Sequence, residues 1–158
     1  MKRLTVLMAL LALLAIPAAG LAATKTYVGK TEQGYRASAK VVDGKLKWVK
    51  FKYRLDCKDS KYTYGPYNGA WVDAPEGPIE QERTRFSDSG SGEDTDPETK
   101  HKLQWTAALS GRILSGGRIK ATHTETFRLF NSKGKEYDRC RDSIDMRLRR
   151  KKAFSRRA

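Results

Sequence analysis

The stretch Val49-Lys50-Phe51-Lys52-Tyr53-Arg54-Leu55-Asp56-Cys57 decides the fold class of this chain. Its apolar side chains occupy every second position, and charged side chains occupy the positions between them. Successive side chains of a β-strand point to opposite faces, so this period of two predicts a strand with one buried and one solvated face.

The same alternation recurs along much of the chain. Further strands are predicted over Gln33 to Val42, Leu103 to Leu109, Ile119 to Leu129 and Glu136 to Leu148. Leu46 and Trp48 are in the opposite phase to Val49, which predicts a β-bulge near Trp48-Val49. Short turns separate the strands, at Asp43-Gly44, Ser115-Gly116-Gly117 and Asn131 to Lys135. Strands joined by short glycine-containing turns favour an all-β fold, a single antiparallel β-barrel or barrel-like sandwich.

Two cysteines, Cys57 and Cys140, are the only ones in the chain. In an exported protein such a pair predicts one disulfide, and two free buried thiols are the alternative. If the two bond, the end of the third strand lies beside the last strand, which favours a closed or nearly closed barrel.

The N-terminus has the order of features of a secretory signal peptide. Lys2 and Arg3 precede the apolar run Leu4 to Ile16, and small residues follow Pro17. We expect residues 1–22 to be removed after Ala22, with Ala23 as the near alternative. A transmembrane anchor is the other interpretation, but the run is shorter than the roughly 20 apolar residues that cross a bilayer. The expected location is therefore secreted, extracellular or in the cell envelope, with one domain over residues 23–148.

The formal net charge of +14 favours an anionic partner. Residues 149–158 are predicted to form a basic tail, and the cations at this end of the chain could bind an anionic surface. The candidate residues are Arg147, Arg149, Arg150, Lys151, Lys152, Arg156 and Arg157. A solvated terminus that only aids solubility is the alternative. Nucleic acid is not favoured as the partner, because the chain has the charge but no recognisable motif.

Two stretches interrupt the alternation. Lys58 to Pro78 is predicted to be a long loop whose aromatic residues form a platform for a sugar or other ligand, or fold back over one end of the barrel. The platform candidates are Tyr62, Tyr64, Tyr67 and Trp71. Ser87 to Glu98 is acidic and glycine-rich, which predicts a solvated hairpin tip; it does not match the twelve-residue EF-hand pattern of a calcium loop.

His123 and Glu125 lie on the inward phase of their strand. A histidine beside a carboxylate could act as an acid–base pair. No serine in a nucleophile-elbow context accompanies them, and the second histidine, His101, completes no metal set. Inward polar residues of a barrel more often satisfy one another, so we predict no catalytic residues, no metal and no cofactor.

Several short motifs occur in a familiar order. They are Tyr-Val-Gly-Lys-Thr at Tyr27 to Thr31, Leu-Ser-Gly-Arg-Ile at Leu109 to Ile113, Gly116-Gly117, and a cysteine in an early and a late strand. This order resembles small exported β-proteins of actinobacteria and related bacteria. Members typically read Cys-Asp-Ser/Thr-Gly near the second cysteine, where this chain reads Cys140-Arg141-Asp142-Ser143. The resemblance implies a β-barrel or sandwich and brings no catalytic residues.

Three functions remain in order of preference. The first is an exported, non-enzymatic domain that binds an anionic polymer or surface of the cell envelope. The second is a calycin-type barrel that carries a small apolar or amphipathic ligand in an internal cavity. The third is a hydrolase, which would need titratable groups converging around His123 and Glu125.

Overall fold

A computed structural model describes residues 23–57, 63–74 and 78–151 of the chain. The described residues form nine β-strands that belong to one antiparallel sheet. The strands are β1 (Thr24–Thr31), β2 (Arg36–Val42), β3 (Lys45–Asp56), β4 (Thr63–Val72), β5 (Glu80–Glu82), β6 (Arg85–Thr95), β7 (Lys102–Leu114), β8 (Arg118–Phe130) and β9 (Glu136–Arg150). The predicted signal peptide, residues 1–22, lies outside the described residues. The part of the chain that the structure describes contains no helix long and apolar enough to cross a membrane.

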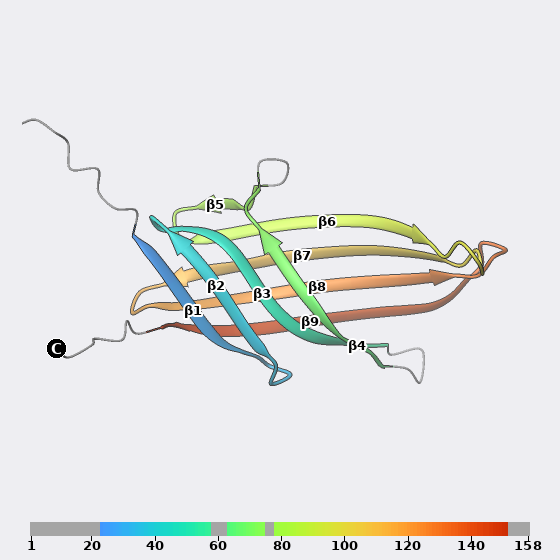
Figure 1. Cartoon of the computed structure of the whole chain (residues 1–158), viewed down its shortest axis with the longest axis horizontal. Coiled ribbons are helices and arrows are strands. Elements are labelled where there is room, and N and C mark those ends of the chain that lie inside the picture. Colours follow the sequence, from blue (N-terminus) through green and yellow to red (C-terminus); the bar gives the residue numbers. More distant parts are fainter. Residues whose placement is uncertain (1–22, 58–62, 75–77, 152–158) are drawn as a thin grey trace, which may run out of the picture.

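The sheet consists of two meanders that meet at the ends of the chain. The strand order is β4-β3-β2-β1-β9-β8-β7-β6-β5, so the first described strand pairs with the last. Five residues of β1, Tyr27 to Thr31, pair with Arg150 to Met146 of β9. Figure 1 shows that β1 to β4 cross over β6 to β9 at an angle, as two layers. A single sheet has therefore folded over upon itself.

The all-β class, the antiparallel sheet and the disulfide are confirmed. The sheet is not closed by strand pairing, because β4 and β5 are its two edges. Of the two predicted architectures, the open sheet fits the barrel-like sandwich. The end of β3 does face β9, but across the interior: β9 is hydrogen-bonded to β1 and β8.

The core lies between the two layers and follows the alternation of the sequence. Val49, Phe51, Tyr53 and Leu55 of β3 are buried, and the charged residues between them are exposed. The facing layer contributes apolar side chains that are all at most 1% exposed, namely Leu109, Ile119, Ile144, Met146 and Leu148. Burial of apolar area from both layers is what holds the folded sheet together.

The disulfide joins the two layers at one end. Cys57 follows β3, Cys140 lies in β9, and both are buried. The two cysteines are 83 residues apart in sequence, and a loop of that length gives about 4–5 kcal/mol of stabilisation in the chain-entropy treatment. Disulfides of this kind persist in oxidising compartments, which is compatible with an extracellular protein.

Two glutamine side chains also link segments that are distant in sequence. The Gln33 amide accepts a hydrogen bond from the Arg54 backbone N–H at 2.8 Å and donates to the Arg54 carbonyl at 2.9 Å. The Gln81 amide of β5 accepts from the Leu46 N–H at 2.8 Å and donates to the Gly44 carbonyl at 2.7 Å. Each amide thus satisfies backbone groups that have no strand partner there.

The long loop predicted over Lys58 to Pro78 and the hairpin tip predicted over Ser87 to Glu98 are largely strand where the structure describes them, so these predictions were wrong there; only Asp96 to Glu98 lie in the turn after β6. Lys58 to Pro78 contains β4, and Ser87 to Glu98 contains most of β6. Gly69 of β4 and Gly92 of β6 are covered by aromatic rings of the neighbouring strand, and so is Gly111 of β7. The in-register pairs are Gly69 with Phe51, Gly92 with Trp105, and Gly111 of β7 with Phe86 of β6. At each of these glycines a Cβ would overlap the ring, so the glycine leaves the space that the aromatic side chain fills.

The predicted turns and bulge are confirmed. Asp43 and Gly44 have φ values of 49° and 80°, as a type I′ hairpin requires. The β2–β3 register shifts between Lys40 and Val41, whose partners are Trp48 and Leu46, so Lys47 is the extra residue. The last strand continues two residues beyond the predicted end, to Arg150.

Gly29→Ala is expected to destabilise the protein by on the order of 1–3 kcal/mol. A Cβ at Gly29 would overlap the Arg147 carbonyl, which is rigid backbone in the β1–β9 pair. Urea unfolding measures the change. Gly90→Ala is the matched control, because a Cβ there meets only the Trp105 ring at 3.6 Å, an ordinary contact. Equal stability of the two variants would contradict this view of the β1–β9 pair.

Candidate functional site: a row of cations on the outer face

Six cations, each from a different strand, lie next to one another across the outer face of the sheet. They occupy consecutive cross-strand positions and all are exposed. In order across the sheet, this cation row is Arg85, Arg112, Lys120, Arg147, Lys30 and Arg36, from β6, β7, β8, β9, β1 and β2. Each residue of the row is the register partner of the next. The row bends with the sheet where β9 meets β1.

The cation row has no acidic partners among the described residues. No ion pair joins any of its six members to a described carboxylate. Arg118 of β8 and Arg149 of β9 are also register partners, and this second pair of cations extends the row. Like charges directly opposite each other in a sheet are destabilising. The row is therefore a cost to the folded protein that an anion would relieve.

Cations at the other end of the same strands are paired. Glu136 accepts hydrogen bonds from Arg128 at 2.6 Å and from Arg139 at 2.7 Å, and these bonds lower the pKa of Glu136 to about 2. Lys102 lies 3.3 Å from Glu93. Among the described residues, ion pairs therefore form at one end of these strands, and the cation row at the other end forms none.

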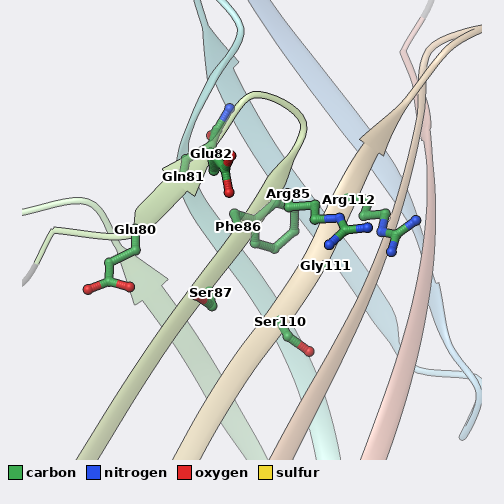
Figure 2. Close-up of a pocket in the computed structure, with 9 residues that line it drawn as sticks. All are labelled: Glu80, Gln81, Glu82, Arg85, Phe86, Ser87, Ser110, Gly111 and Arg112. Atoms are coloured by element: carbon green, nitrogen blue, oxygen red, sulfur yellow. The ribbon is translucent and has the colours of Figure 1, made fainter.

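Three surface depressions follow the cation row. The first has a volume of about 630 Å³. Figure 2 shows that the guanidinium groups of Arg85 and Arg112 lie next to each other there, and that Ser87 and Ser110 follow further along the same two strands. A second, of about 430 Å³, includes Lys30 and Arg147. A third, of about 1230 Å³, includes Lys30 and Arg36 and continues over β3 and β4. Carboxylates are present along the row too: Glu80 and Glu82 line the first depression, and Glu32 and Asp145 line the second.

The predicted basic tail is partly a strand. Arg147, Arg149 and Arg150 belong to β9, so their assignment to a terminal tail was wrong. The ladder continues because the Arg150 N–H donates to the Gly117 carbonyl and the Lys151 N–H donates to the Thr26 carbonyl. Of the predicted tail residues, Lys152, Arg156 and Arg157 lie outside the described residues.

Of the predicted aromatic platform, Tyr64, Tyr67 and Trp71 belong to β4 rather than to a loop. The ring of Tyr67 is 5.8 Å from Tyr53 and 6.2 Å from Phe127, measured between centroids, and Tyr67 is 37% exposed. Trp71 packs against the core. Tyr62 and the side chain of Tyr64 lie outside the described residues, so the structure places the side chains of two of the four candidates, Tyr67 beside Tyr53 and Phe127 and Trp71 against the core.

The predicted acid–base pair is part of a buried polar cluster. Trp71 Nε1, which can only donate, lies 3.3 Å from His123 Nδ1, so that nitrogen accepts and the proton resides on Nε2. His123 Nε2 lies 3.4 Å from Glu125 Oε2. Burial, and then the nearby Glu125 carboxylate, raise the pKa of Tyr53 and of Tyr67. The three depressions along the cation row are not lined by His123 or Tyr53.

Two residues of the acidic stretch Ser87 to Glu98 are engaged within the protein, Glu93 of β6 and Asp96 of the following turn. Glu93 accepts hydrogen bonds from Lys102 and Gln104, and Asp96 accepts from the backbone N–H groups of Glu98 and Thr99. These bonds lower the pKa of Glu93 and of Asp96. Within the described ranges, the one close group of three potential metal ligands is Cys57, Asp138 and Cys140, whose sulfur atoms are joined in the disulfide.

Sequence reasoning found one member of the cation row, Arg147, and assigned it to a tail. Arg85, Arg112, Lys120, Lys30 and Arg36 are far apart in sequence and adjacent only through strand register. Each of these cations occupies one of the charged, outward-facing positions that the alternation of its strand already indicates. Which of these positions lie next to each other depends on the register between strands, and a single sequence does not give that register.

The fold and site define an all-β protein with one open antiparallel sheet, folded as a barrel-like sandwich with an unpaired cationic row on its outer face. Comparison with models of known protein families, with curated proteins and with solved structures finds no match to this chain. The resemblance to exported actinobacterial β-proteins stays a prediction.

We expect the free energy of unfolding to fall as pH rises above about 10, because of Tyr53. The folded protein holds the Tyr53 proton above its ordinary pKa of 10.0, whereas the unfolded chain releases it there. This contribution is fully present below pH 10 and is lost above it, by about 1.4 kcal/mol per pH unit for one proton. Between pH 8 and about 11, the free energy of unfolding measured in urea should therefore fall less steeply for Tyr53→Phe than for the wild type. Tyr137→Phe, at a residue that is 53% exposed, is the control, and identical slopes for both variants would contradict the account.

Proposed function

We propose that this protein is an exported, non-enzymatic binding domain that engages an anionic polymer of the cell envelope through the cation row. The observation that carries the proposal is that six exposed cations stand in register without an ion pair to any described residue, whereas Lys102, Arg128 and Arg139 near the other end of the same strands are paired. A polyanion would supply the negative charge that no described ion pair gives to these cations.

The dimensions of the row suit a polymer better than a single small anion. Six neighbouring strands span about 24 Å along the sheet, because adjacent strands lie about 4.8 Å apart. Three depressions along this path give an extended chain several places to contact the surface. Many weak contacts to a repeating anion add up to useful affinity, and each is screened by salt.

Two further features support export. Residues 1–22 have the order of sequence features that predicts a signal peptide, and the buried Cys57–Cys140 disulfide suits an oxidising compartment. The envelope of the exporting cell is then the nearest polyanionic material. The sequence also has three cations after Lys151, namely Lys152, Arg156 and Arg157, which add to the positive charge of the protein.

The two other functions stay predictions with less support. The depressions along the cation row lie on outer faces of the sheet rather than between the layers, where a carried ligand would bind. In the buried His123–Glu125 pair, His123 is hydrogen-bonded to Trp71 and Glu125 is hydrogen-bonded to Tyr53. A substrate would have to displace these side chains before any acid–base step.

Neutralising three adjacent members of the row should release the protein from envelope material. We expect Arg112→Gln/Lys120→Gln/Arg147→Gln to bind isolated bacterial envelope fragments on the order of 100-fold more weakly at low salt, since each cation near an anionic surface contributes about 1 kcal/mol. Co-sedimentation at low and high sodium chloride measures this, and the wild type should be retained only at low salt.

The control removes the same charge from the opposite end of the sheet. Lys100→Gln/Lys133→Gln/Lys135→Gln alters exposed turn residues and should bind like the wild type. A second comparison uses a chain ending at Lys151, which keeps β9 whole and should retain most of the binding. The proposal is wrong if both triple variants bind alike, or if truncation abolishes binding while the row variant retains it.

A further inference from the structure

A second patch, made of short hydroxyl side chains, lies beside the cation row on the outer face of β6 to β9. It contains every outward-facing residue of three consecutive ranks except Ala108, Arg141 and Asp145. This hydroxyl field consists of Ser87, Ser110 and Thr122 in the first rank, Ser89, Thr124 and Ser143 in the second, and Ser91, Thr106 and Thr126 in the third. The first rank is one step of the strand alternation away from Arg85, Arg112 and Lys120.

The short side chains of the hydroxyl field form a shallow area of the surface between longer side chains. A depression of about 500 Å³ lies over it and is lined by Ser89, Ser91, Thr124 and Thr126 among others. Arg112 and Lys120 stand on one side, and Arg141 closes the other side in register with Thr126. Small side chains let a ligand come close to the sheet, while the flanking cations reach up around it.

Most of these hydroxyl groups are free to bind a ligand. Thr122 Oγ1 donates to Asp145 Oδ1 at 2.7 Å. The other eight side chains of the field make no hydrogen bond to another described residue. Each free hydroxyl offers one donor and two acceptor lone pairs at a fixed place on a rigid sheet.

The partner that complements both features carries acidic groups and many hydroxyls on one chain. Water satisfies isolated surface hydroxyls, so a single serine would mean little. Here many hydroxyl groups stand in register, with cations on two sides of them. This arrangement complements a row of sugar rings, because sugar hydroxyls both donate and accept hydrogen bonds. The acidic groups of the sugars would form ion pairs with the arginines. We propose that the outer face of β6 to β9 binds an acidic polysaccharide, in which the sugar rings lie on the hydroxyl field and carboxylates pair with the cation row. This rests on the proposed function and names its ligand class.

The test compares two polycarboxylates that differ in hydroxyl content. Polygalacturonate bears one carboxylate and free hydroxyls on each sugar, and polyacrylate bears carboxylates alone at higher density. Charge alone would favour polyacrylate. We expect the full chain to bind polygalacturonate at least about tenfold more tightly at near-physiological salt, because several hydrogen bonds add to the ionic contacts.

A variant without the hydroxyls locates the preference. Ser89→Ala/Thr124→Val/Thr126→Val keeps every charge and should lose about tenfold in affinity for polygalacturonate, with no change for polyacrylate. Thr24→Val/Thr26→Val/Ser132→Ala removes as many exposed hydroxyls elsewhere and should leave both affinities unchanged. Circular dichroism verifies that each variant is folded.

The possible failures are distinguishable. Equal binding of both polymers per carboxylate, or tighter binding of polyacrylate, would overturn the polysaccharide assignment while the cation row still binds polyanions. Absence of binding to either polymer at low salt would overturn both proposals. The comparison of polymers on the wild type decides the matter even if the hydroxyl variant does not fold.

Discussion

The pairing of β1 with β9 is the constraint on which the rest of this structure depends. Each half of the chain could form a meander from local hairpins alone, but only this five-residue ladder makes them one sheet. With the ladder in place, the sheet folds over and buries β3 against β8 and β9. The ladder is also tight, since Gly29 leaves no room for a side chain against Arg147. The same register brings Lys30 next to Arg147, so the fold and the cation row depend on one set of hydrogen bonds.

The two faces of the sheet perform different tasks. The inner face is sealed by apolar packing, by the Cys57–Cys140 bridge and by a buried cluster in which His123 and Glu125 satisfy polar neighbours. The outer face carries cations and hydroxyls that the protein itself leaves largely unused. Successive side chains of a β-strand point to opposite faces of the sheet, so every second residue belongs to the outer face. The residues of the outer face can therefore vary without disturbing the core.

Much of the fold could be predicted from the sequence because alternation and turn chemistry are local signals. The period of two from Val49 to Cys57, the Asp43-Gly44 turn and the single cysteine pair led directly to an antiparallel all-β fold with one disulfide. The strands β4 and β6 were missed because their glycines read as loop signals, whereas an aromatic ring from the neighbouring strand covers each of Gly69 and Gly92. The candidate site could not be predicted. Arg85 and Arg36 belong to one row only through the register of six strands, and a single sequence does not state that register.

The most direct test of the cation row is an amide chemical-shift titration of the folded protein by nuclear magnetic resonance. Short oligomers of galacturonate and of acrylate would be added in separate experiments. The account predicts that, with either oligomer, the largest shifts cluster at Arg112, Lys120, Arg147 and Lys30 and disappear at high salt. Shifts centred on Tyr67 and Trp71, or confined to residues after Lys151, would contradict it.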